Sequence, residues 1–468
     1  MPEGELAIVL HTHMPYVEGF GTWPFGEEWL WEAIATSYLP LLEVLDDHSA
    51  RGAHRTPPVT LSLTPVLCDQ LAAPGAMERC VSFLREIRPE SHRRDIAELG
   101  AAAQEPAAVE LERSAAEYAG AADRLEALEA QGGLLGALGA HASWTSAATH
   151  AILPLLTTDR GIELQVRTGI ASHRRRFTRW DGGFWLPECA HASWVGLALR
   201  RAGVTATCVE LTRRLGPGDP RHLHPLSDDS GPVLWPLDRS VIAWVWGEGG
   251  YPSRARYRDY HRYTTHRHRV HRIDGALYDH VAAVAQARAD AAEFVAGVRE
   301  RVAGGGVCVC ALDTELLGHH WYEGPVWLRA VLEEAAAQGL RLTRLDHATL
   351  ERHEPRPTPD QARSPHATSW GTGEDLRTWS GPRAAPFAWR ARRAERALAS
   401  RDQRPPDRAL RELLALQSSD WAFLHGCDLS GDYPEERAAG HEAALHQALT
   451  DPADPSLRSL APWLEGWG

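Results

Sequence analysis

Short apolar runs that recur at long intervals constrain the fold of this 468-residue chain most strongly. The segments between these runs are too long for hairpins, and several contain helical patterns such as DAAEFVAGVRERV at 290–302. Strands that alternate with helices in this way predict βα units around a parallel sheet. We predict strands at 5–10, 59–63, 144–148, 183–186, 205–209, 240–246, 307–312 and 340–345.

The number and spacing of these units favour a (β/α) barrel over residues 1–365, with an open doubly wound sheet as the alternative. The stretch between the second and third strands is too long for a plain crossover and is rich in Ala, Glu, Leu and Arg. It predicts an inserted helical subdomain at 70–140. Amphipathic patterns of period 3.6 beyond a Pro/Arg-rich stretch predict an all-helical carboxyl-terminal domain at 366–468.

Composition and charge exclude several classes of function. The net charge of −13 argues against nucleic acid and against anionic membrane surfaces, which both need clustered cations. We expect no membrane-spanning helix, because such a helix needs ~18 consecutive apolar residues and no stretch of the sequence reaches this length. The amino-terminal sequence has no basic region before its apolar run, and the seven cysteines contain no CxxC pair. These features predict a cytoplasmic protein with reduced thiols.

Two residue types stand out in the composition. The chain contains no lysine, which excludes Schiff-base chemistry, a phosphate-loop lysine and a carboxylated lysine bridging two metals. It contains 18 tryptophans against 8 phenylalanines. Indole rings suit the apolar faces of sugars, and their N–H groups can donate to hydroxyls. The excess of tryptophan therefore favours a carbohydrate ligand.

The candidate chemistry lies at the ends of the predicted strands, because a parallel barrel forms its active site at the carboxyl ends of its strands. A polar or charged residue follows most of the apolar runs. The candidates are His11 and His13, Thr149 and His150, Glu188, Glu210, Glu248, and Asp313 with Glu315. Their convergence at one rim predicts a catalytic site.

Glu188 in WLPECA and Asp313 in ALDTELLGHHWYEGP form the pair that glycosidic bond cleavage requires. One carboxyl group donates a proton to the leaving oxygen, and the other attacks or stabilises the anomeric carbon. Spacing alone does not decide which is the acid. Two alternatives stay open: a mononuclear metal hydrolase that uses His11, His13 and His150, and a sugar-binding barrel without catalysis.

These motifs resemble glycoside hydrolase family 57, and within it the α-1,4-glucan branching enzymes. The resemblance covers nearly the whole chain. It rests on HTHMPYV, SAATHAILPLL, WLPECA, LDTELLGHHWYEGPVWL, SWGTGEDLRTW and LQSSDWAF, in that order. WLPEC and LDTELLGHHW are the most specific of these matches.

The resemblance implies an incomplete (β/α)7 barrel with an inserted helical domain and a helical carboxyl-terminal domain. It also implies a retaining mechanism with Glu188 as nucleophile and Asp313 as general acid/base, without metal or cofactor. The substrate would be an α-glucan such as amylose, glycogen or a maltooligosaccharide. The substrate-binding candidates are His11, His13, His150, Trp29, Trp246, His319, Trp321, Trp370, Trp379, Asp420 and Trp421.

The chain departs from the family pattern at one loop. Related branching enzymes carry a long lid loop with a tyrosine at its tip, between the strands that we place at 205–209 and 240–246. This chain has no tyrosine between Tyr118 and Tyr251. A lid keeps water away while the glycosyl-enzyme waits for a sugar hydroxyl. Its absence favours, as the alternative to branching, a mainly hydrolytic α-amylase-like activity or a 4-α-glucanotransferase.

Overall fold

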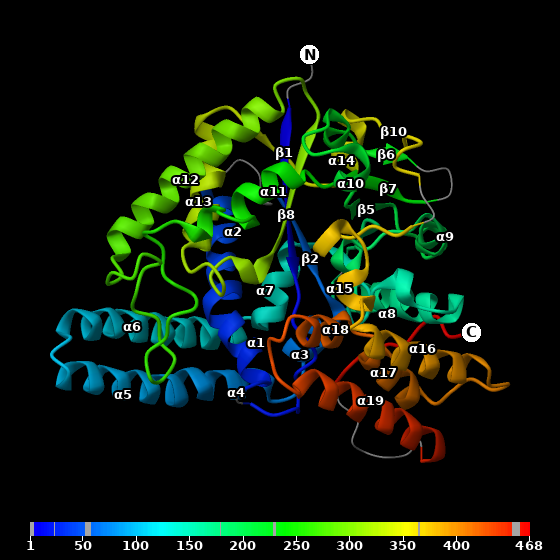
Figure 1. The fold of residues 1–468 in the computed structure, drawn as a ribbon, viewed down its shortest axis with the longest axis horizontal. Helices are drawn as coiled ribbons and strands as arrows, with labels where there is room; N and C mark the ends of the chain where they lie inside the picture. Colours follow the sequence, from blue (N-terminus) through cyan, green and yellow to red (C-terminus); the bar gives the residue numbers. More distant parts are fainter. Residues whose placement is uncertain are drawn as a thin grey trace.

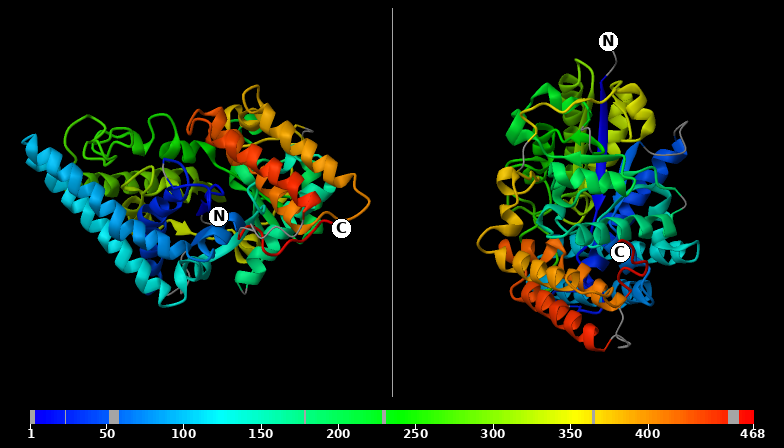
Figure 2. Two further views of the ribbon diagram at one scale, coloured as in Figure 1. Left: turned by 90° about the horizontal axis from the view of Figure 1, so that it is seen from below. Right: turned by 90° about the vertical axis from the view of Figure 1, so that its right-hand side faces the viewer.

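A computed structural model describes residues 4–22, 24–51, 58–177, 179–227, 231–363, 366–451 and 459–468 (Figure 1). In these ranges, helices surround one sheet, a long helical pair extends from one side, and a group of helices lies below the sheet (Figures 1 and 2). None of the described helices is long and apolar enough to cross a membrane.

Seven parallel strands form the centre of the described sheet, in the order β7-β5-β4-β3-β2-β1-β8. The backbone N–H of Asp238, directly after β7, donates to the carbonyl of Val309 in β8 at 3.0 Å, so the two ends of the sheet approach each other. This arrangement confirms the incomplete (β/α)7 barrel. The strands are β1 (Glu5–Thr12), β2 (Val59–Leu63), β3 (Ala142–Ser146), β4 (Gly183–Trp185), β5 (Ala206–Val209), β7 (Val233–Pro236) and β8 (Val307–Asp313).

Two of the predicted strands were wrong in type or length. Residues 240–246 belong to a helix, α11 (Arg239–Trp246), whose buried face carries Val241, Ile242 and Val245. A short apolar run satisfies both periods, so its sequence does not separate a strand from a helix. The run at 340–345 contains only the two-residue β9 (Arg341–Leu342), which pairs with β1. The equally short β6 (Leu226–Ser227) and β10 (Arg356–Pro357) extend the β7 edge.

The barrel strands are buried on both faces, as expected when helices cover a parallel sheet. Every residue of β1 is buried, and so is β8 as far as Leu312. Asp313, the last residue of β8, is exposed. The surrounding helices are α1 (Glu27–Ala33), α2 (Leu39–Arg51), α3 (Pro65–Leu71), α8 (Asp159–Arg176), α9 (Ser193–Arg201), α10 (Thr212–Leu215), α12 (His280–Arg301), α13 (Gly324–Ala337) and α14 (His347–Arg352).

A helical insertion follows β2. It comprises α4 (Ala76–Ser82), α5 (Arg88–Ala101), α6 (Glu105–Glu129) and α7 (Gly133–His141). α5 and α6 run side by side as the pair that extends from the barrel, and the green segment before α12 hangs across them (Figures 1 and 2). These helices lie within the range predicted for the inserted subdomain, whose boundaries stay a prediction.

The carboxyl-terminal helices pack around their own apolar cluster, which includes Leu410, Leu413 and Leu414. Tyr16 and Ile152 from the barrel belong to the same cluster, so this group of helices is joined to the barrel through a shared core. The helices are α15 (Arg377–Ser380), α16 (Ala385–Ala399), α17 (Asp407–Leu416), α18 (Ser419–Gly426) and α19 (Tyr433–Thr450). α18 begins next to the carboxyl edge of the sheet, where Ser419 N–H donates to the carbonyl of His150 at 3.3 Å.

Candidate active site

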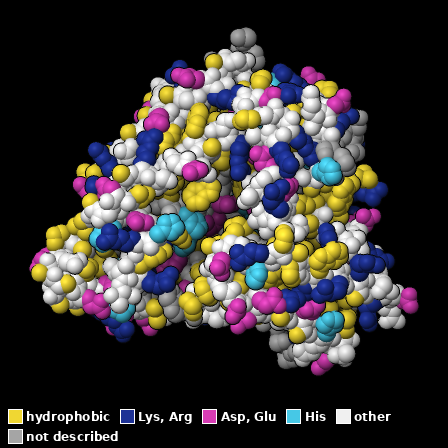
Figure 3. All heavy atoms as spheres, viewed as in Figure 1, with side chains coloured by type: hydrophobic (Ala, Val, Ile, Leu, Met, Phe, Trp, Pro, Cys, Tyr) yellow, Lys and Arg dark blue, Asp and Glu magenta, His cyan; other side chains and the backbone are white. Residues whose placement is uncertain are grey.

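The carboxyl ends of β1, β3, β4 and β8 bring the predicted catalytic residues together. His11 near the end of β1 pairs in register with Asp313 at the end of β8. His150 and Glu188 follow β3 and β4, which are neighbours in the sheet. Acidic side chains lie inside a hollow on one face of the molecule, with histidine and hydrophobic side chains at its margin (Figure 3).

Glu188 lies in a strained turn directly after β4. Its backbone has φ 60° and ψ 22°, and the next residue, Cys189, has φ 51°. Such left-handed conformations are costly for residues with a side chain and persist where the surrounding structure enforces them. The indole N–H of Trp370 donates to Glu188 Oε2 at 2.6 Å, and His150 Nδ1 lies 3.8 Å from Oε1. The turn thus presents a carboxylate that the indole N–H of Trp370 holds through one oxygen.

The carboxyl groups of Glu188 and Asp313 influence each other electrostatically. Burial, together with the charge of Asp313, raises the pKa of Glu188 to about 8, against the lowering effect of the Trp370 hydrogen bond. Desolvation by the cleft walls raises the pKa of Asp313 to about 6, although its side chain is open to solvent within the cleft. The pair therefore holds a proton near neutral pH, as general acid catalysis requires.

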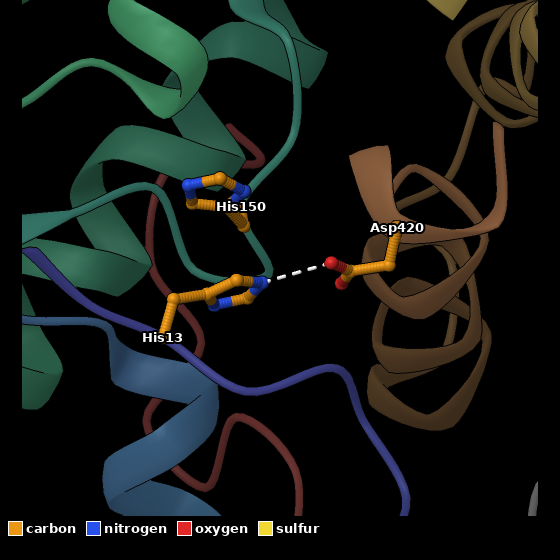
Figure 4. A group of neighbouring side chains, drawn as sticks. All are labelled: His13, His150 and Asp420. Carbon is orange, nitrogen blue, oxygen red and sulfur yellow. Dashed lines mark hydrogen bonds and ion pairs between the residues drawn. The ribbon is translucent and has the colours of Figure 1, made fainter. Parts of the chain in front are cut away.

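A chain of histidines lines the site beside Glu188. His11 Nε2 lies 2.9 Å from His150 Nε2, and His150 Nδ1 lies 2.9 Å from Ser419 Oγ. Desolvation lowers the pKa of both His11 and His150 well below the usual range, so both rings are neutral. His13 Nε2 lies 2.9 Å from Asp420 Oδ1, which projects from α18 (Figure 4). The carboxyl-terminal helices thus supply part of the wall of the site.

His13, His150 and Asp420 are a possible set of metal ligands, because their ligand atoms lie within 4.8 Å of one another. A metal binds in the plane of an imidazole, along the nitrogen lone pair. The rings of His13 and His150 instead stack, with centroids 4.0 Å apart and 18° between their planes. The lone pairs of the two rings therefore lie in nearly parallel, separate planes. This geometry favours a hydrogen-bonding role for the histidines over the metal-hydrolase alternative.

Glu315 holds the end of β1 in place. Its Oε1 accepts from the hydroxyl of Tyr38 at 2.6 Å and from the backbone N–H of His13 at 3.1 Å. Burial raises the pKa of Glu315 to about 8. Tyr38 was not among the sequence candidates, because a buried tyrosine in an apolar helix carries no signal that distinguishes it from a core residue. Glu315 therefore positions His13 beside Asp313.

Comparisons with known proteins match this site and this fold. The model of a family described as "Glycosyl hydrolase family 57" matches residues 143–356, which include Glu188 and Asp313. A probable 1,4-alpha-glucan branching enzyme of Mycobacterium tuberculosis (strain ATCC 25618 / H37Rv) is 32% identical over 518 residues, which cover 99% of this chain and 95% of that protein. The chain belongs to glycosyl hydrolase family 57.

Further family 57 members resemble the chain at a similar level. A 1,4-alpha-glucan branching enzyme of Thermococcus kodakarensis is 29% identical, over 96% of this chain and 74% of that protein. The crystal structure of a GH57-type branching enzyme from Pyrococcus horikoshii matches with a TM-score of 0.84 and 28% identity, over 98% of this chain and 93% of that one. The resemblance thus extends over both the barrel and the carboxyl-terminal helices.

Several sequence candidates of this family 57 chain are buried or follow a different element from the one predicted. Glu210 is fully buried and accepts from the N–H of Thr212, so it caps a turn. Glu248 follows helix α11 and not a strand, which corrects its expected place at a strand end. Three tryptophans predicted to bind substrate have side chains buried in the cores: Trp321, Trp379 and Trp421. Core packing explains these three better than sugar contact.

Other tryptophan and histidine candidates have side chains that are partly exposed. Trp370 is half-buried beside Glu188, and its ring meets the edge of Trp185 at 5.1 Å between centroids. Trp246 is 58% exposed and lies 6.4 Å from His320, the neighbour of His319. Trp29 is half-buried and lies 5.6 Å from Tyr433 of α19. We keep these three and His319 as proposed substrate contacts.

Trp370 and Trp379, only nine residues apart, are expected to respond differently to substitution. Trp379→Ala should lower the free energy of unfolding by about 3–5 kcal/mol, because it empties a core position. Trp370→Ala should unfold near the wild-type temperature but lose about 10–100-fold in activity, because a donor to a charged carboxylate disappears. Thermal unfolding and initial rates on amylose measure both effects. The reverse pattern would contradict our assignment of the two residues.

Proposed function

We propose that this chain is a 1,4-α-glucan branching enzyme that works through a glycosyl-Glu188 intermediate. The observation that carries this proposal is the pair of electrostatically coupled carboxyl groups, Glu188 and Asp313, at the open carboxyl edge of the sheet. Its similarity over nearly its full length to branching enzymes of family 57 supports α-glucan as the substrate.

The first step would break an α-1,4 bond of the donor glucan. Asp313 gives its proton to the glycosidic oxygen, while Glu188 attacks the anomeric carbon and forms a β-linked ester. The hydrogen bond from Trp370 supports Glu188 as the ionised partner, because an N–H donor stabilises a carboxylate. In the free site, however, the pKa of Glu188 is higher than that of Asp313, so the proton resides on Glu188 before the substrate binds. Positive charge developing at the anomeric carbon would move the proton to Asp313.

The second step would transfer the glycosyl group to an acceptor glucan. Asp313, now ionised, takes the proton of a 6-hydroxyl, whose oxygen attacks the anomeric carbon and releases Glu188. Two inversions leave the new α-1,6 bond with the original configuration. If water enters in place of the acceptor, the same intermediate is hydrolysed.

A mainly hydrolytic activity is the second candidate, and it rests on the segment expected to form the lid. Residues 228–230 of that segment lie outside the described part. The remainder is attached to the sheet edge, because β6 pairs with β7 and β10, and Arg214 donates to the carbonyl of Ala362 at 2.5 Å. The described part of this segment contributes no tyrosine to the cleft. Water would then compete with the acceptor more easily.

Incubation with amylose distinguishes the two candidates. Branching should create α-1,6 linkages, measured as new short chains after debranching, while the number of reducing ends stays nearly constant. Hydrolysis should raise the number of reducing ends without new branches. Activity should survive a chelator in either case, because the two carboxyl groups need no Lewis acid. Loss of activity that zinc restores would instead support the metal-hydrolase alternative.

A further inference from the structure

A second cavity of about 630 Å³ lies beside the candidate active site. Helices α1, α2 and α6 line it, together with the segment 258–269 and the segment 318–329. Gly318 and His319 belong to this lining and follow Asp313 closely in the sequence. The cavity lining therefore includes part of the segment that follows Asp313.

The backbone after Asp313 also forms part of the cavity wall, and it is held there firmly. The hydroxyl of Ser37 donates to the carbonyl of Leu317 at 2.8 Å and accepts from the N–H of His319 at 3.2 Å. Gly318 has φ 106°, and a Cβ at this position would lie 1.7 Å from the carbonyl oxygen of Thr36. A ligand in the cavity would thus have a fixed position relative to Asp313.

The segment 258–269 covers the cavity with aromatic and cationic side chains. The guanidinium of Arg269 lies 4.1 Å from the ring centroid of Tyr260, and it donates to the hydroxyl of Tyr263 and to the carbonyl of His319, both at 3.2 Å. The ring of Tyr260 lies 5.0 Å from that of His320. Tyr263 is 38% exposed. These contacts link the cover of the cavity directly to the segment that follows Asp313.

Four of the six arginines in the cavity lining form ion pairs, and Arg269 is held by Tyr260, Tyr263 and the carbonyl of His319. Arg88 pairs with Glu32 at 3.0 Å, and ion pairs also join Arg124 to Glu43, Arg258 to Glu110, and Arg329 to Asp47. A phosphate site would require cations that are free to bind the anion. Paired charges and tyrosines instead provide fixed donors, acceptors and ring faces, which suit a neutral ligand with many hydroxyl groups.

We propose that this cavity binds the acceptor α-glucan chain, an inference that rests on the proposed branching function. The reason is chemical. Asp313 must protonate the leaving oxygen and later deprotonate the acceptor hydroxyl, so the leaving and acceptor chains lie on its side of the cleft. Trp370 stands on the Glu188 side, where the donor glycosyl group is attached. The segment that follows Asp313 forms part of the cavity wall.

Separate measurements of donor and acceptor use test this inference. The donor is α-maltotriosyl fluoride, whose fluoride leaves without acceptor help, and the acceptor is maltohexaose. Tyr263→Ala should raise the acceptor concentration for half-maximal transfer about tenfold, as expected for one lost aromatic contact. Fluoride release without acceptor should stay within about twofold of wild type. The matched control is Ile273→Ala, because Ile273 is equally exposed in the same connection and lies outside the cavity lining.

Hydrogen exchange provides a test that does not depend on turnover. In Glu188→Gln, maltohexaose should protect the segment 258–269, and Tyr263→Ala in that background should remove the protection, while Tyr263→Phe should keep it. Unchanged acceptor dependence in Tyr263→Ala, or protection by inorganic phosphate in place of maltohexaose, would overturn the inference while the branching function stands. No action of the wild type on either amylose or the fluoride would contradict the proposed function itself.

Discussion

Glu188→Gln should lower the rate on amylose by a factor of ~10³ or more, because no glycosyl-enzyme can form without the nucleophile. The side chain keeps its size, so the fold should be preserved, and thermal unfolding checks this. The matched control is Glu210→Gln, which changes a buried carboxylate after the neighbouring strand β5. Its activity should stay within about an order of magnitude of wild type, because Glu210 accepts from Thr212 in its own turn and pairs with Arg239 at 3.9 Å, and neither partner is a catalytic carboxyl group.

Azide should partly restore the activity of Glu188→Gln on an activated donor. A small anion that replaces the missing carboxylate attacks the anomeric carbon once and produces the β-glycosyl azide in one step. Mass spectrometry of the protein should then detect no covalent adduct. A variant that keeps wild-type activity, or that still accumulates an adduct on another carboxylate, would refute the assignment of Glu188.

Asp313→Asn should be nearly inactive on amylose but should still react with α-maltotriosyl fluoride. Fluoride leaves without a proton, so Glu188 can form the ester, while the second step lacks its base. The intermediate should therefore accumulate as a mass increase on the peptide that contains Glu188. Azide needs no base and should displace Glu188 from the β-linked ester with a second inversion, which releases the α-glycosyl azide. An adduct on Glu315 or Glu210, or no adduct on any residue, would contradict the proposed roles, as would an inverted product from the wild type.

The same variant should change the pH dependence of ester formation. The charge of Asp313 raises the pKa of Glu188, so its removal should lower that pKa. Glu188 attacks only when it is ionised. The rate of fluoride release in Asp313→Asn should therefore remain high at lower pH than in wild type, as single-turnover measurements from pH 5 to 9 can determine. A shift of the profile to higher pH would contradict the coupling of the two groups.

The sequence by itself determined the barrel and the two principal candidates. Alternation of strands and helices implies a parallel sheet, and a parallel sheet gathers the residues that follow its strands at one edge. For this reason Glu188 and Asp313 could be predicted to lie together although 125 positions separate their numbers in the chain. The absence of lysine restricted the chemistry independently of the fold.

Only the tertiary structure decided which side chains complete the site. The pair of His13 and Asp420 joins residues 407 positions apart, and the bond from Trp370 to Glu188 spans 182 positions. Local patterns also did not distinguish the open Trp370 from the buried Trp379, nor the helix at 240–246 from a strand. Periodicity records which face of one element is apolar, whereas burial and hydrogen-bond partners depend on the elements that pack against it.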